Sequence, residues 1–147
     1  MKIAFVQQEL YPYMSYMYLG GIARKMDHRV EVFVINDESS FQELQKYKPE
    51  VVCFTATTPN YSFTKEMAKK TRVELTGSFI LVGGWHPTFN PDILKNETCF
   101  DAMVLGEGEI PFQRFLELYP DLDRVKDIPN LHVRVDGKTF RNPIANL

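Results

Sequence analysis

Several classes of protein are excluded by what this sequence has little of. Its 147 residues include only two cysteines, Cys53 and Cys99, and they form no CxxC pair, so we expect buried, reduced thiols. Lysine and arginine number 17 against 19 aspartates and glutamates, a net charge of −2. No basic block stands out, which argues against a nucleic-acid partner.

Long apolar runs are also missing. The longest uncharged stretch, residues 10–23, is interrupted by Pro12, Gly20 and Gly21 and is shorter than the ~20 residues that a membrane span needs. The first residues show no charged region followed by an apolar segment and a cleavage site, as a secretory signal would. We therefore expect a cytoplasmic protein with no membrane segment.

What is present is the pattern of a single α/β domain. Apolar residues make up 44% of the chain and charged residues 24%, which is ordinary for a globular domain. Short apolar runs alternate with segments of helical spacing, and the runs fall at residues 3–6, 30–35, 51–55, 79–82 and 102–105. This alternation predicts a doubly wound, flavodoxin-like or Rossmann-like fold with a five-stranded parallel sheet in the order 2-1-3-4-5. Ligands of such folds bind at the carboxyl ends of the strands.

The pattern changes after residue 120. Residues 131–135 and 139–141 flank Asp136-Gly137-Lys138, a signal for a β-hairpin. An isolated hairpin is marginal in water, so it should pack on the edge of the sheet or on something absent from this chain. We expect residues 1–127 to form the α/β domain and residues 128–147 to form the hairpin and a linker toward a further domain.

Tyrosines are concentrated after the first expected strand. Aromatic residues make up 13% of the chain, and four tyrosines fall between Tyr11 and Tyr18, with Tyr13 and Tyr16 between them. Two interpretations are open: the rings form an apolar wall for a large flat ligand, or they cap the core. No glycine-rich phosphate loop occurs here, which argues against NAD and nucleoside triphosphates.

The other strand ends carry the remaining candidates for a binding site. Hydroxyls follow the third strand, glycines and a histidine follow the fourth, and glycines with a carboxylate follow the fifth. The residues are Thr55, Thr57 and Thr58; Gly83, Gly84 and His86; Gly106, Glu107 and Gly108. The hydroxyls can bond a ligand or cap the next helix, and paired glycines allow a bulky ligand to approach the backbone. A lone loop histidine is more often a hydrogen-bonding residue than a metal ligand. No catalytic set or metal-ligand cluster emerges.

Taken in order, these segments resemble the cobalamin (vitamin B12)-binding domain of cobalamin-dependent radical S-adenosylmethionine proteins. That family includes methyltransferases and anaerobic cyclases of the magnesium-protoporphyrin ester type. The resemblance rests on Gly83-Gly84-Trp85-His86-Pro87-Thr88, Gly106-Glu107-Gly108-Glu109, Ile128-Pro129-Asn130-Leu131, Asp136-Gly137-Lys138 and Asn142-Pro143. It covers essentially the whole chain.

The resemblance implies where cobalamin would lie. The corrin would cover the strand ends above the Tyr11–Tyr18 segment, and the nucleotide tail would enter between the sheet and a helix. Thr55, Thr57 and Thr58 would contact the tail, and Gly83 and Gly84 would line it. The segment from Gly106 to Gly108 would border its pocket.

Two departures from related cobalamin proteins narrow this expectation. Domains of the mutase type carry Asp-x-His-x-x-Gly after the first strand, whereas residues 8–13 here contain no histidine, so bound cobalamin should lack a protein imidazole ligand. The Cys-x-x-x-Cys-x-x-Cys motif of the radical domain is also absent. S-adenosylmethionine and a 4Fe-4S cluster would therefore belong to a downstream domain of a longer chain.

The sequence thus favours a cobalamin-binding module from the N-terminal part of a radical S-adenosylmethionine enzyme, which performs methyl transfer or anaerobic cyclisation. Two alternatives remain open at this point. One is a flavodoxin-like carrier or receiver-like domain, and the other is a degenerate domain that binds no cofactor and only docks its neighbour.

Overall fold

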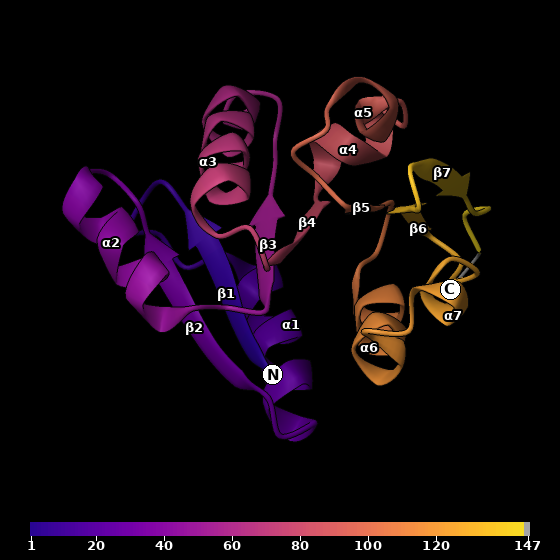
Figure 1. Cartoon of the computed structure of the whole chain (residues 1–147), viewed down its shortest axis with the longest axis horizontal. Coiled ribbons are helices and arrows are strands. Elements are labelled where there is room, and N and C mark those ends of the chain that lie inside the picture. The colour runs from indigo at the N-terminus through magenta and orange to yellow at the C-terminus, as the bar shows by residue number, and fades with distance from the viewer. Residues whose placement is uncertain (146–147) are drawn as a thin grey trace.

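The computed structural model describes residues 1–145 and contains one seven-stranded sheet (Figure 1). The strand order is β2-β1-β3-β4-β5-β6-β7, in which the first five strands run parallel and the last two antiparallel. The strands are β1 (Lys2–Gln7), β2 (Arg29–Val34), β3 (Val51–Thr55), β4 (Phe79–Gly83), β5 (Ala102–Val104), β6 (Leu131–Val135) and β7 (Lys138–Arg141). The predicted fold class and the order 2-1-3-4-5 are confirmed.

The sheet has two more strands than the five predicted, because the hairpin extends it. Strand β6 pairs with β5, with Ala102 opposite Val133 and Val104 opposite Leu131. Leu131 and Val133 are fully buried, and they belong to the same hydrophobic core as the buried residues of α1 and α6. Antiparallel pairing with β6 satisfies the backbone groups on the outer side of β5, which would otherwise be an unpaired edge. Of the two positions considered for the hairpin, the edge of the sheet is the one observed.

Helices cover both faces of the sheet. The helices are α1 (Met14–Lys25), α2 (Glu38–Tyr47), α3 (Tyr61–Glu74), α4 (Trp85–Phe89), α5 (Ile93–Asn96), α6 (Glu109–Leu118) and α7 (Leu122–Val125). Helices α1, α6 and α7 pack on one face, here called the cavity face, and α2, α3, α4 and α5 lie on the opposite face, here called the filled face (Figure 1). Such two-sided cover is what the nearly continuous apolar runs of the parallel strands require.

Each face has its own core. The cavity face buries Phe5, Phe112 and Phe115, and the filled face buries Phe41 and Phe100. Both cysteines are buried and free. Within residues 1–145, no helix is long and apolar enough to cross a membrane.

Candidate functional site

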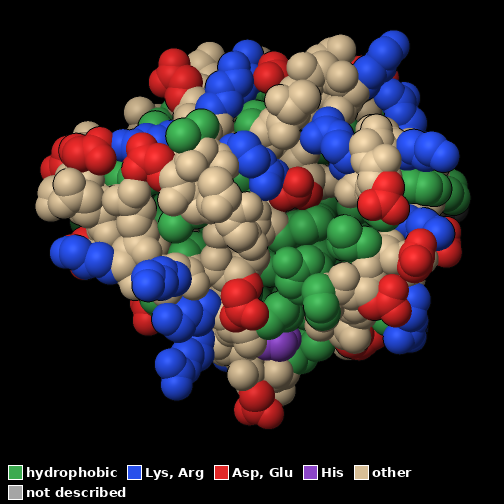
Figure 2. Space-filling view, viewed as in Figure 1, with side chains coloured by type: hydrophobic (Ala, Val, Ile, Leu, Met, Phe, Trp, Pro, Cys, Tyr) green, Lys and Arg blue, Asp and Glu red, His purple; other side chains and the backbone are tan. Residues whose placement is uncertain are grey.

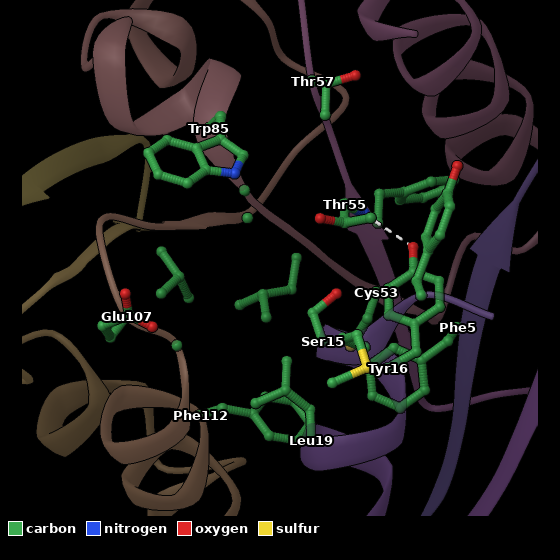
Figure 3. Close-up of a pocket in the computed structure, with 18 of the residues that line it drawn as sticks. Phe5, Ser15, Tyr16, Leu19, Cys53, Thr55, Thr57, Trp85, Glu107 and Phe112 are labelled. Carbon is green, nitrogen blue, oxygen red and sulfur yellow. Dashed lines mark hydrogen bonds between the residues drawn. The ribbon is translucent and has the colours of Figure 1, made fainter.

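A cavity of about 500 Å³ opens on the cavity face at the carboxyl ends of the parallel strands (Figure 3). Its floor is built by side chains from four adjacent strands, namely Phe5, Cys53, Leu81 and Val104. Leu19 of α1 and Phe112 of α6 close it from the other side. The cavity thus lies between the sheet and two helices, at the edge where ligands of open parallel sheets bind.

The mouth of this cavity is apolar and exposed. Tyr11, Met14 and Trp85 line it, and their side chains are 66%, 63% and 69% accessible to solvent. Apolar side chains gather near the middle of the face shown in Figure 2, in the region where Figure 1 places the strand ends beside α6. Large exposed aromatic residues beside a hollow are typical of a site that a ligand or partner covers.

Tyr16 joins the cavity wall to the core. Its hydroxyl donates to the carbonyl oxygen of Val6 at 2.7 Å and accepts from the N–H of Thr55 at 2.9 Å, so the phenol ties β1 to β3. The ring packs on Phe5 with centroids 4.7 Å apart. Burial raises the pKa of Tyr16 well above its usual value, because the phenolate would lose its hydration. The hydroxyl is therefore a fixed structural donor and acceptor.

The tyrosine-rich segment thus divides between the two interpretations of the sequence. Tyr16 belongs to the core and lines the cavity, Tyr13 is half-buried in the lining, and Tyr11 stands exposed at the mouth. Tyr18 is exposed and lies outside the lining. The segment is neither a continuous wall nor wholly a cap on the core.

The hydroxyl residues after β3 separate in a similar way. Thr55 and Thr57 line the cavity. Thr58 lies outside it, and its hydroxyl is hydrogen-bonded to Nδ1 of His86 at 3.1 Å. The ring of His86 stacks on Tyr61 with centroids 4.0 Å apart, and partial burial lowers the pKa of the imidazole. The structure therefore does not bring Thr58 and His86 together with the other predicted site residues.

The glycines of the site differ in how much room their surroundings leave for a side chain. Gly83, Gly84, Gly106 and Gly108 all line the cavity. A Cβ on Gly84, where φ is +101°, would lie 2.7 Å from the carbonyl oxygen of Ala56. Gly84 is therefore needed for close packing against the loop after β3. A Cβ on Gly108 would meet Leu19 and Val104 of the cavity lining at 3.9 Å, which is ordinary van der Waals contact, so a larger side chain there would extend among the lining residues.

Thr88 connects the two glycine loops. Its hydroxyl donates to the carbonyl oxygen of Gly84 at 2.8 Å and accepts from the N–H of Gly106 at 3.0 Å. Gly106 has φ +67°, a conformation that favours glycine. The loop after β5 is therefore held in place from the side of α4.

Charge in the lining comes from carboxylates alone. Glu107 and Glu109 are the charged residues there, and the described lining contains no lysine, arginine or histidine. Among residues 1–145, no group of three or more His, Cys, Asp or Glu side chains is placed to hold a metal ion. The cavity therefore suits a largely apolar ligand that forms hydrogen bonds with hydroxyl and backbone groups.

Sequence reasoning missed much of the lining. The missed residues are Phe5, Pro12, Met14, Ser15, Leu19, Cys53, Phe54, Asn60, Leu81, Trp85, Thr88, Val104, Glu109 and Phe112. Alternation along the strands was a usable signal, because Phe5, Cys53 and Leu81 lie on the strand face that α1 covers. Trp85 also had a signal, since a large apolar residue follows two glycines at a strand end.

A second, smaller cavity of about 340 Å³ lies on the filled face between α3 and α4. Tyr61 and His86 line it together with polar residues from the loop after α4. Burial, with Glu97 nearby, raises the pKa of Tyr61 to about 12. Asn90 Nδ2 donates to the His86 carbonyl oxygen at 2.8 Å, while Asp92 and Glu97 accept from Arg141 and Lys65, which lie outside the lining.

This chain is similar to several known proteins. The family model described as the B12 binding domain matches residues 7–116. The chain is 28% identical over 138 residues to uncharacterized methyltransferase PH0819 of Pyrococcus horikoshii, which covers 90% of this chain and 30% of that protein. It is 30% identical over 143 residues to the anaerobic magnesium-protoporphyrin IX monomethyl ester cyclase of Rubrivivax gelatinosus, which covers 86% of this chain and 25% of that protein.

Two solved structures share the fold. The radical S-adenosylmethionine methyltransferase TsrM from Kitasatospora setae, with cobalamin and a [4Fe-4S] cluster bound, aligns with a TM-score of 0.74 at 16% identity. The cobalamin-dependent S-adenosylmethionine radical enzyme OxsB, with aqua-cobalamin and S-adenosylmethionine bound, aligns with a TM-score of 0.76 at 16% identity. Both alignments cover 99% of this chain, but only 29% and 22% of those proteins. The chain thus spans less than a third of the length of each of these four proteins.

Proposed function

This chain belongs to the B12-binding domain family, and on that premise we propose that its cavity receives the nucleotide tail of cobalamin while the corrin ring lies across the mouth. The observation that carries the proposal is the cavity itself. It is floored by apolar residues of four parallel strands and opens among exposed aromatic residues at the strands' carboxyl ends.

The size and lining of the cavity fit the tail. Its volume of about 500 Å³ lies within the ~300–1,000 Å³ typical of small-molecule sites and is smaller than a corrin with its side chains. The aromatic base of the tail would pack against the apolar floor at Phe5, Leu81 and Val104. Ser15, Thr55 and Thr57 lie in the same lining and can bond its polar groups.

The N-terminus of α1 supports the same orientation. Met14 and Ser15 begin this helix and line the cavity, and its first turn has no acidic residue. Free backbone N–H groups at a helix N-terminus favour an anion, so the tail's phosphate can be accommodated without a cation in the lining. Helix α6 differs, because Glu109 occupies its first turn.

The mouth residues would hold and shield the ring. Tyr11, Met14 and Trp85 offer exposed apolar surface, which a corrin would remove from water. Bound cobalamin supplies a cobalt centre for methyl transfer or radical chemistry. No imidazole lines the described cavity, so this chain's contribution is to bind and orient the cofactor and to exclude water beneath it. Thr58 and His86 remain proposed contacts, but only for parts of the cofactor beyond the cavity.

We extend the proposal to the whole protein. The relatives are three to four times longer than this chain, and two structural neighbours are radical S-adenosylmethionine enzymes. In this proposal, residues 1–127 bind cobalamin, and residues 128–147 lead to a radical domain in the same chain that holds S-adenosylmethionine and a 4Fe-4S cluster. The parent enzyme would be a cytoplasmic methyltransferase or cyclase.

The test is to fill the cavity and measure retention of the cofactor. Wild type, Gly108→Leu and Gly77→Leu are mixed with hydroxocobalamin, passed over a gel-filtration column and examined by visible spectroscopy. Leucine at position 108 would project into the cavity, whereas Gly77 is exposed and a Cβ there has no neighbour within 4 Å. We expect wild type and Gly77→Leu to retain the corrin chromophore and Gly108→Leu to lose it. A wild type that retains none would overturn the proposal and favour a docking domain.

A further inference from the structure

Asn130 is the buried member of a small group of strained residues. Four non-glycine residues between positions 1 and 145 have positive φ, namely Asp27, Lys48, Asn130 and Asp136. Asp27, Lys48 and Asp136 are exposed, whereas Asn130 is only 2% exposed, with φ 63°. Asparagine tolerates this region better than most residues, but a buried example needs compensating contacts.

On one side, Asn130 holds the loop after β5. Its Nδ2 donates to the carbonyl oxygen of Leu105 at 3.1 Å, and its own carbonyl oxygen accepts from the N–H of Leu105 at 2.8 Å. Leu105 leads directly into Gly106, whose N–H donates to Thr88. The segment from Gly106 to Gly108, which lines the cavity, is thus fixed between Asn130 and Thr88.

On the other side, Asn130 holds the segment after β7. Its Oδ1 accepts from the N–H of Ala145 at 2.8 Å, and its N–H donates to the carbonyl oxygen of Pro143 at 3.0 Å. Asn142 supports this arrangement by donating from Nδ2 to the carbonyl oxygens of Lys126 and Leu131. Residues 143–145 are therefore held by hydrogen bonds to Asn130, the same residue that holds the cavity loop.

We propose that Asn130 is a positioning residue that couples residues 143–145 to the cavity loop at Leu105–Gly108. A partner that draws residues 143–145 away would loosen the loop, and a ligand that orders the loop would hold residues 143–145 in place. The two effects are equal in free energy, because coupling between two sites is reciprocal. That the ligand is cobalamin rests on the function proposed above, but the coupling itself does not.

The first test needs no cofactor. Ala145→Pro removes one N–H donor and leaves Asn130 and the cavity loop unchanged in sequence. Amide hydrogen exchange is followed by NMR in wild type and variant. We expect the amides of Leu105 and Gly106 to exchange about fivefold faster in the variant, and those of Ala4 and Phe5 in β1 to be unchanged. Unchanged exchange at Leu105 and Gly106 overturns the coupling.

The second test measures affinity for hydroxocobalamin in a titration. Asn130→Gly keeps a residue that accepts positive φ but removes both side-chain hydrogen bonds. The control, Asp136→Gly, also places glycine at a positive-φ position, but in an exposed turn. We expect Asn130→Gly and Ala145→Pro to weaken binding about three- to tenfold and Asp136→Gly to leave it unchanged.

The outcomes separate the two proposals. A wild type that binds no cobalamin overturns the proposed function, while the exchange experiment still decides the coupling. Normal affinity in both Asn130→Gly and Ala145→Pro overturns the claim that the coupling reaches the ligand. Should Asn130→Gly fail to fold, the affinity of Ala145→Pro alone decides that claim.

Discussion

The two faces of the sheet are built from the same strands but are filled differently. On the filled face, Phe41, Leu94 and Phe100 are fully or almost fully buried and pack against the strands. On the cavity face, Phe79, Phe115 and Tyr119 pack together at the amino ends of the strands, with centroids 5.1–5.3 Å apart, while the carboxyl ends border the cavity. Since protein interiors are normally close-packed, an apolar hollow confined to one end of one face indicates a place kept for a ligand.

Alternation within single strands assigns neighbouring residues to different faces. In β3, Cys53 faces the cavity and Phe54 belongs to the core of the filled face. In β5, Val104 faces the cavity and Met103 belongs to the filled face. In these two strands the smaller residue lies on the hollow side, whereas in β1 the larger Phe5 lies there and Val6 faces away. The void therefore depends on where α1 and α6 lie and not on small strand residues alone.

Truncation on the filled face should give the largest effect. Phe100→Ala removes a fully buried ring, and we expect a loss of about 3–5 kcal/mol in the free energy of unfolding, because the neighbours cannot fill the space. Phe89→Ala, which removes an exposed ring, is the control and should change stability by less than about 0.5 kcal/mol. Chemical denaturation measures both. Similar losses would mean that the filled face is not tightly packed.

Tyr16 tests the boundary between cavity and core. Tyr16→Phe leaves the Val6 carbonyl and the Thr55 N–H without their partner, so we expect a loss of about 2–3 kcal/mol in unfolding free energy. Tyr11→Phe removes an exposed hydroxyl and should be neutral within about 0.5 kcal/mol. An equal effect of the two replacements in urea denaturation would contradict the division of the tyrosine-rich segment.

Enlarging a residue should cost more on the filled face than on the cavity face. Val82→Leu adds a methylene to a fully buried site and should destabilise by about 1–2 kcal/mol. Val104→Leu extends toward the cavity, so the expected loss is below about 0.5 kcal/mol. The same Val104 variant should retain less corrin. Thermal unfolding and gel filtration check the two halves of this prediction.

The smallest effect concerns pH. His132 lies between Leu131 and Val133 of β6, whose side chains join the core of the cavity face, so its imidazole points to the filled face. Burial lowers the pKa of His132 below its ordinary value of about 6.5, so the unfolded chain takes up a proton that the native chain resists. The contribution of neutral His132 to the free energy of unfolding should therefore be fully present above that value, and stability should fall as pH drops from 7 to 5.

A variant isolates this contribution. His132→Gln cannot titrate in this range, so its unfolding midpoint should depend less on pH between 7 and 5 than that of wild type. His28 and His86 shift in the same direction and account for part of the remaining slope. A wild type and variant with parallel pH profiles would show that the imidazole of His132 is not held neutral by burial.

Local sequence patterns predicted most of the strands and the hairpin that follows them. The apolar runs at residues 51–55 and 79–82 correspond closely to β3 and β4, because strands buried on both faces must be apolar throughout. The hairpin was also predicted, and the edge of the sheet, where it lies, was one of the two positions expected for it. Pairing between β5 and β6 depends on how α6 and α7 bring Leu131 back to Val104, and no local pattern encodes that return.

Individual site residues were less predictable. Thr57 and Thr58 are identical neighbours, yet Thr57 lines the cavity and Thr58 bonds His86, since the chain turns between them. Tyr11 and Tyr16 differ because Tyr11 precedes α1, whereas Tyr16 lies in α1 and packs on Phe5. Asn130 gave no signal of its role, because its conformation and its four hydrogen bonds depend on segments distant in sequence.

The position of Trp85 has a practical consequence. The chain contains a single tryptophan, and this residue stands 69% exposed at the mouth of the cavity. The tryptophan fluorescence of this chain therefore reports on that one place. A ligand that covers the mouth would dry the indole and shift its emission to shorter wavelength, and an absorbing ligand would quench it. Entry into the cavity can thus be timed in a stopped-flow instrument without any added label.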